Sequence, residues 1–305
     1  MQEPKFNPYA ALAIGVASVS ASAILVKVSS ASSGVIAFYR LLFTMLLMLP
    51  FFLLKNLPEL KVINKKDLFL SIFAGIFLAF HFILWFESLD YTSVASSTVL
   101  VTLQPLFAFA GAFLFFKERF SIRAIISGIV AVAGSLVISW GDFQISGLAL
   151  WGDILSLIAC ALITAYLLLG QSVRKRISST TYTFMVYGIS TVTLFLYVTI
   201  AGESLGPYPT EDWIYFILLA VFPNLLGHSL FNWSLKWLNT TTISMAILME
   251  PVGASILAFF ILDEKILWTQ VVGGVVIIAS LIIFLKDEKK TKAAENVMEK
   301  AASSR

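Results

Sequence analysis

Long apolar runs constrain this chain more than any other feature of its sequence. A helix needs roughly 20 apolar residues, each rising about 1.5 Å, to cross the hydrocarbon core of a bilayer. The sequence is 59% hydrophobic and 13% charged, whereas a soluble domain is about 25% charged. Ten runs of sufficient length lie near residues 9–27, 34–55, 68–87, 93–116, 122–139, 149–169, 181–201, 213–232, 242–262 and 268–285. They predict an all-α integral membrane protein with ten transmembrane helices.

The two halves of the chain repeat one another faintly. Ser88, Pro105, Glu118 and Gly128 recur as Ser234, Pro251, Glu264 and Gly274, in each case 146 positions later. We therefore divide the chain into a cytoplasmic N-terminus at 1–8, a first repeat at 9–139, a second repeat at 149–285 and a charged cytoplasmic tail at 286–305. Because each repeat has five helices, an odd number, the second must enter the membrane from the opposite side. Such inverted repeats are typical of secondary transporters, with the substrate site where the repeats meet.

The distribution of lysine and arginine predicts the orientation of the chain. With the N-terminus in the cytoplasm, 18 of the 21 basic residues lie in inner segments, and only Lys27 and Lys265 lie outside. The remaining one, Arg40, falls within a span. Cytoplasmic loops carry an excess of positive residues. We therefore expect a multi-pass protein of a bacterial-type plasma (inner) membrane with both termini in the cytoplasm.

Several short motifs occur in order along the chain. They are Phe38-Tyr39-Arg40, Trp85 with Ser88-Leu89, Gln104-Pro105 with Lys117-Glu118, Gly152-Asp153, and Glu250-Pro251 with Asp263-Glu264. In this order and spacing they resemble EamA-type carriers of the drug/metabolite transporter superfamily, over about residues 9–285. The resemblance implies a ten-helix bundle that exports or exchanges small metabolites such as amino acids or drug-like compounds. It does not fix the substrate.

Polar side chains within two spans are candidates for the substrate site. Asn224, His228 and Asn232 recur every four residues and so share one helix face. They must face the bundle, because polar groups that face lipid are unsatisfied. There they either line a central cavity or bond neighbouring helices. His81 and Trp85 share a face of the third span in the same way, as cavity or as structural residues.

Gln104 and Glu250 are related by the 146-residue spacing, and each precedes a proline. Proline removes a backbone donor and loosens the helix, which is tolerated where the helix borders a cavity. Apolar surroundings favour a protonated carboxyl, so Glu250 is a candidate for proton coupling or for binding a substrate amine; a purely structural carboxyl is the alternative. Thr98 and Thr102, like Ser18 and Ser22, are hydroxyl pairs at helical spacing that also suit a cavity lining or a bond to their own helix.

Arg40 and Glu87 are candidates for an outer gate. A charge in mid-membrane costs about 2.5–3.5 kcal/mol on insertion scales, so it usually faces a cavity or a partner. Arg40 lies inside the outer end of the second span, and Glu87 lies near the outer end of the third. A pair between them can form and break during transport. The alternatives are a static pair or an Arg40 side chain that extends to the interface.

The sequence lacks the motifs of other functional classes. The sequence has no phosphate-binding loop of an ATP motor and no zinc-protease or hydrolase motif. We expect a non-enzyme without cofactor, metal or nucleic-acid partner, which carries a small metabolite on the energy of a gradient, with protons as candidate coupling ions. The alternatives are a passive facilitator or channel and, less favoured, a lipid-modifying membrane enzyme that uses His81, His228 and Glu250.

Overall fold

The computed structural model describes residues 4, 6–140, 147–261, 263 and 265–303, and this part of the chain is helical, without strands. Within it, nine helical segments are long and apolar enough to cross a membrane: Pro8–Val28, Ser33–Lys55, Lys65–Tyr91, Val94–Phe116, Gly147–Val173, Ser179–Ala201, Thr210–Ser234, Thr240–Ile261 and Trp268–Thr291. The fifth predicted span is the apolar helix α7 (Ile122–Ile138), which is shorter at 17 residues. Glu264 and both ends of the chain lie outside the described residues.

Four of the nine segments consist of consecutive shorter helices. The elements are α1 (Pro8–Val19), α2 (Ser22–Val28), α3 (Ser33–Lys55), η1 (Leu57–Val62), α4 (Lys65–Tyr91), α5 (Val94–Val101), α6 (Gln104–Phe116), α7, α8 (Gly147–Val173), α9 (Ser179–Ala201), α10 (Thr210–Leu219), η2 (Ala220–His228), α11 (Ser229–Ser234), α12 (Thr240–Ile247), α13 (Glu250–Ile261) and α14 (Trp268–Ser303). The broken segments are α1–α2, α5–α6, α10–η2–α11 and α12–α13.

The backbone repeats itself at the same spacing as the sequence. Helices α5 and α12 begin 146 positions apart and end 146 positions apart, and α6 and α13 follow them at that spacing. Pro105 and Pro251 stand at the second position of α6 and α13, where a missing N–H leaves no bond unmade. Lys117 and Asp263, also 146 apart, both adopt the left-handed conformation, with φ of 58° and 53°.

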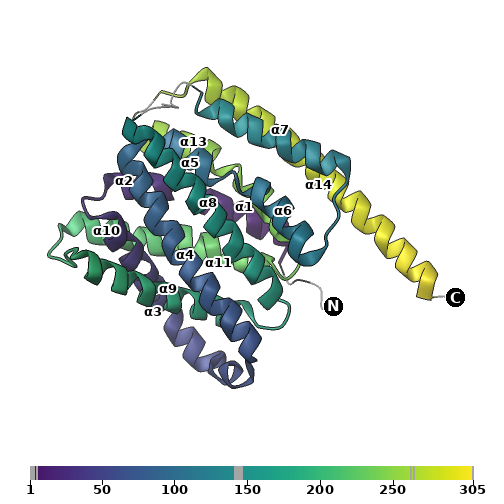
Figure 1. Ribbon diagram of the computed structural model, residues 1–305, viewed down its shortest axis with the longest axis horizontal. Helices are drawn as coiled ribbons and strands as arrows, with labels where there is room; N and C mark the ends of the chain where they lie inside the picture. Colours follow the sequence, from purple (N-terminus) through teal and green to yellow (C-terminus); the bar gives the residue numbers. More distant parts are fainter. Residues whose placement is uncertain (1–3, 5, 141–146, 262, 264, 304–305) are drawn as a thin grey trace.

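Helix pairs from the two halves pack against one another. Helix α4 runs along α8, α3 along α9, and α7 along α14, while α1 packs against η2 and α11. Figure 1 shows α7 and α14 side by side at one edge of the bundle, with the C-terminal part of α14 projecting beyond it. Gly273 permits the close approach of α7, because a Cβ there would lie 2.5 Å from the Gly134 carbonyl oxygen.

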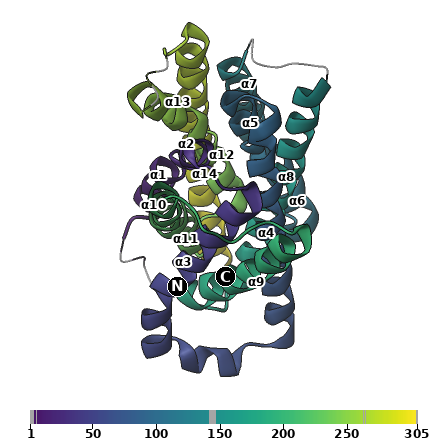
Figure 2. The ribbon, with the colours of Figure 1, turned by 90° about the vertical axis from the view of Figure 1, so that its left-hand side faces the viewer.

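The outer surface of the bundle remains apolar. Leu54, Phe115 and Ile200 are 83%, 74% and 84% exposed, which suits contact with lipid tails rather than water. A buried core of aliphatic and aromatic side chains, including Leu78, Phe82 and Tyr187, joins helices from both halves. Figure 2 shows the connection between α3 and α4 at the lower end of the molecule.

Candidate functional site

A small closed cavity lies where the two broken segments α5–α6 and α12–α13 meet the rest of the bundle. Its lining consists of Val19, Ser22, His81, Trp85, Val101, Gln104, Ile163, His228, Phe231, Ile247 and Glu250. Gln104 and Glu250 open the second helix of each broken segment, so the two breaks face one space. The cavity has a volume of about 20 Å³, enough for about one water molecule.

Three polar atoms of the cavity residues lack a hydrogen-bond partner among the described residues: Trp85 Nε1, Gln104 Oε1 and His228 Nδ1. One is a donor and one an acceptor, and the imidazole nitrogen can be either. Buried polar groups are seldom left unpaired, and those that are call for an explanation. Their convergence on one cavity indicates a site that can bond a polar solute.

His81 and Trp85 form one wall of the cavity. Their rings stack at 5.7 Å with an interplanar angle of 25°. His81 Nδ1 lies 2.9 Å from the Ala159 carbonyl oxygen, which only accepts, so Nδ1 carries the hydrogen and Nε2 of a neutral ring is an acceptor. His228 meets Phe82 and Phe231 at ring edges, with centroids 5.5 and 5.8 Å away. The site therefore combines aromatic surface with a few hydrogen-bonding groups, as small-molecule sites commonly do.

Arg40 is fully buried beside this cavity and bonds neutral partners. Its Nε and Nη2 donate to Asn224 Oδ1 over 3.1 and 2.5 Å, and its Nη1 donates to the cavity residue Ser22 over 3.1 Å. The guanidinium also lies 4.1 Å above the Phe82 ring. Asn224 thus serves Arg40 and is not part of the cavity lining.

The predicted pairing of Arg40 with Glu87 is not formed in this structure. The described residues contain no ion pair between them, because the guanidinium turns inward to Asn224. A span's sequence gives the depth of a residue in the membrane but not the neighbour it faces. The proposed gate between these two residues therefore has no support from the contacts seen here.

The other predicted cavity residues, all buried except the half-buried Ser18, do not line the cavity. Asn232 accepts from Tyr166 over 2.6 Å and donates to Thr183 over 3.2 Å, so it joins three helices. Thr102 donates to carbonyl groups of its own helix. Thr98 is buried, and its hydroxyl has no partner among the described residues, but it does not line the cavity. Ser18 likewise bonds its own helix.

Apolar cavity residues were missed by sequence reasoning. Phe231, Ile163 and Ile247 line the cavity, yet nothing distinguishes them from other apolar residues in the same runs. The one available sequence signal was helical spacing, since Phe231 lies three residues after His228. Among the described residues, no group of three or more His, Cys, Asp or Glu side chains is placed to hold a metal ion.

The architecture and motifs agree with a comparison against protein families. The model of the EamA-like transporter family matches residues 8–140 and again residues 150–286. The chain belongs to this family. The EamA protein described here is therefore a multi-pass membrane protein of a transporter family, as its motif order predicted.

Similar proteins carry transporter names. An uncharacterized transporter, YxxF, of Bacillus subtilis is 24% identical over 73% of this chain and 71% of its own length. An uncharacterized transporter of Archaeoglobus fulgidus is 22% identical over 81% of this chain and 85% of its own length. The riboflavin transporter ImpX of Fusobacterium nucleatum is 21% identical over 81% of this chain and 86% of its own length. A crystal structure of another protein has the same fold, with a TM-score of 0.71 and 13% sequence identity over 90% of this chain and 98% of that one.

Proposed function

We propose that this EamA protein is a secondary active transporter that exports small metabolites, such as amino acids or drug-like compounds, by alternating access. In this proposal ten transmembrane helices, α7 included, form two inverted repeats at 9–139 and 149–285 in an inner membrane, with both termini in the cytoplasm. The observation that carries the proposal is the cavity bordered by Gln104 and Glu250, because paired helix breaks mark the substrate site in such transporters.

The chemistry of the cavity supports a small solute with both polar and flat apolar parts. His81, Trp85 and Phe231 offer ring surface, while Gln104 and His228 offer unpaired polar atoms. The riboflavin transporter name of one relative supports a small-molecule cargo in general. At about 20 Å³ the cavity holds no metabolite, so we interpret this conformation as closed at both ends, and opening of one end must create the binding volume.

Glu250 is our candidate for coupling transport to protons. Its carboxyl is buried and makes no side-chain hydrogen bond among the described residues. Arg40 donates to Ser22, which lines the same cavity as Glu250. A carboxyl so placed can exchange a proton when the cavity opens, and its charge changes the electrostatic balance with Arg40.

Solute flux in proteoliposomes tests the proposal. Purified protein should accelerate the flux of a metabolite identified by thermal-shift screening, since a ligand stabilises the folded protein by mass action. Glu250→Gln and His228→Ala should each slow flux, whereas Glu211→Gln, at an exposed position, should not. Flux that survives both cavity substitutions would contradict the assigned site.

Counterflow separates this proposal from a passive facilitator or channel. A carrier preloaded with unlabelled solute should take up labelled solute faster, because a loaded site reorients, whereas an open pore shows no such stimulation. The closed cavity favours the carrier. Turnover of a lipid in detergent would instead support the lipid-modifying enzyme.

A further inference from the structure

Two carboxylate contacts lie at opposite ends of the helix pair α3 and α9. At one end Ser178, the N-cap of α9, donates its hydroxyl and backbone N–H to Glu59, which follows α3. At the other end Ser32, the N-cap of α3, donates to Glu203, which follows α9, over 2.6 Å. Ser32 and Ser178 are 146 positions apart, so the contacts are counterparts in the two halves. The 23 residues of α3 separate them by about 35 Å.

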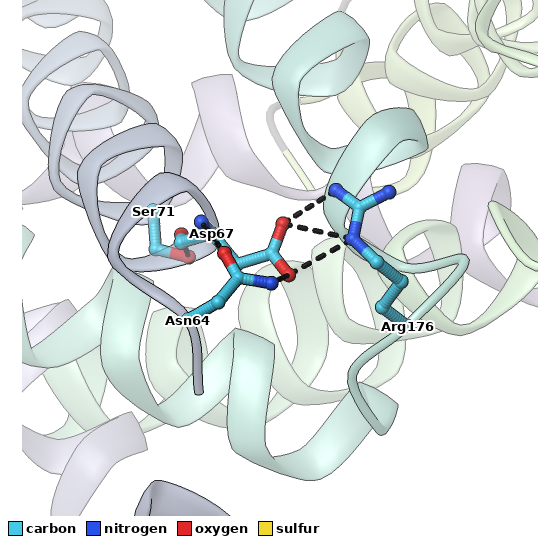
Figure 3. Close-up of polar contacts among 4 residues, drawn as sticks. All are labelled: Asn64, Asp67, Ser71 and Arg176. Carbon is cyan, nitrogen blue, oxygen red and sulfur yellow. Dashed lines mark hydrogen bonds and ion pairs between the residues drawn. The ribbon is translucent and has the colours of Figure 1, made fainter. Parts of the chain in front are cut away.

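A second carboxylate extends each contact. Asp67, at the third position of α4, accepts from Arg176 Nε over 2.9 and 3.1 Å and also from Nη2 (Figure 3). Asp212, at the third position of α10, accepts from Ser29 Oγ over 2.6 Å and from the Ser30 backbone and hydroxyl over 2.9 and 2.5 Å. Ser30 and Arg176 are again 146 positions apart. In each cluster the carboxylates come from one half of the chain and the donors named above come from the other half. Asn56 and Asn64 add donations to Glu59 and Asp67 within the first half.

We propose that these clusters are the latches that close the two ends of the transporter, an inference that rests on the alternating access proposed above. The inner latch consists of Glu59, Asp67, Arg176 and Ser178, and the outer latch consists of Ser29, Ser30, Ser32, Glu203 and Asp212. Both are formed in the structure whose cavity has room for about one water molecule. Because the contacts between these residues join the two halves, parting the halves at one end must break that latch and can leave the other intact.

The two latches differ in chemistry at one related position. The inner latch has the forked guanidinium of Arg176 on Asp67, which is 2% exposed. The outer latch has hydroxyl and backbone donors on Asp212, with Ser30 in the position related to Arg176. Both carboxylates accept charge-assisted bonds, but only the Arg176 guanidinium adds a positive charge and a forked geometry on the donor side, which makes the inner contact the stronger one. The inner end should therefore open less readily than the outer end, and Arg176→Ser should make the ends more alike.

Spin-label distances in the full chain, reconstituted in lipid, test the latches one end at a time. On a Cys160→Ala background, labels at Lys61 and Lys175 report the inner end, and labels at Val28 and Glu211 report the outer end; all four positions are exposed. Asp67→Asn should lengthen the inner distances and leave the outer ones unchanged. Asp212→Asn should do the reverse.

Further variants guard against misfolding and non-specific effects. Arg176→Gln removes the same inner contact from the other side and should act like Asp67→Asn. The exposed Asp90→Asn removes a carboxylate outside both latches and should change neither distance. The proposal is overturned if the latch variants move neither pair, or if each variant moves both pairs alike.

Flux measured in the same membranes distinguishes this inference from the proposed function. If the two ends open independently but no solute moves, the latch proposal is supported and the proposed transport function is contradicted. If counterflow is rapid but the distances are unchanged in every latch variant, the proposed transport function is supported and the latch proposal is contradicted.

Discussion

At the residue scale, Arg40 determines how the polar groups near the cavity are arranged. Its guanidinium is buried and is held by two donations to Asn224, one to Ser22 and stacking on Phe82. The sequence predicted that a charge in this span needs a partner, and that expectation fits the contacts seen. The partner that it predicted was Glu87, whereas Arg40 contacts Asn224 in the structure. The rotation of each helix about its axis comes from packing and cannot be obtained from local sequence.

Replacement of Asn224 should destabilise the protein more than a typical core substitution. Asn224→Ala leaves two guanidinium nitrogens without their acceptor, and removal of one partner of a buried charge costs about 3 kcal/mol or more. Asn224→Asp keeps an acceptor oxygen and should cost less. Thermal unfolding in detergent measures both variants. An Asn224→Ala protein that unfolds at the wild-type temperature would show that Arg40 finds another partner.

Glu59, in the connection after α3, should make the stability of the inner end fall in acid. Burial raises the pKa of Glu59, but hydrogen bonds from Ser178, Thr181 and Asn56 outweigh it and hold the pKa below its ordinary value of 4.5. A lowered pKa in the folded state means that the stabilisation is fully present above about pH 4.5 and is lost as the pH falls through the folded value.

Stability measured against pH tests this assignment. Glu59→Gln should cost about 1 kcal/mol near neutral pH, the typical worth of a hydrogen bond, and the difference from wild type should shrink below pH 4.5. A difference that stays constant down to pH 3 would mean that the Glu59 charge does not support these contacts.

At the element scale, prolines predicted some helix breaks, whereas tertiary contacts set others. Pro105 and Pro251 marked the breaks before α6 and α13. The break between α1 and α2 had no such signal; it lies beside Gly253, where a Cβ would come within 2.2 Å of Ser20 Oγ. Pro223 lies inside η2, whose wider π-helical turns connect Ser229 N to Asn224 O. The span was predicted, but this local widening depends on neighbours that the sequence alone does not identify.

The close approach of α7 and α14 gives an element-scale prediction. Gly273→Ala should cost about 1–3 kcal/mol by overpacking, because a Cβ at Gly273 would lie 2.7 Å from Ile138 Cγ1 and 3.0 Å from the Ile138 backbone N. Gly188→Ala is the matched control, since its Cβ would meet only Met45 Sδ at 3.6 Å. Thermal unfolding of both variants checks the contact, and equal unfolding temperatures would contradict it.

At the scale of the whole molecule, the 146-residue spacing links sequence, backbone and cavity. The spacing related Gln104 to Glu250, and the structure brings both to one cavity with His81, Trp85 and His228. It did not identify Asn224 and Asn232 as bundle contacts, because an amide on an inward face serves a cavity or a neighbour equally well. The repeat therefore predicted that Gln104 and Glu250 lie together, while the detailed lining of the cavity depended on side-chain packing.

Opposite insertion of the two repeats is the central claim, and labelling of related positions tests it most directly. Arg119 and Lys265 are 146 positions apart, in the connections that precede α7 and α14. On a Cys160→Ala background, Arg119→Cys and Lys265→Cys are treated with a membrane-impermeant thiol reagent in intact cells and in inverted vesicles. We predict that the cysteine at 265 reacts only in intact cells and that at 119 only in inverted vesicles. Reaction of both from the same side would contradict the inverted repeat and the transport mechanism built on it.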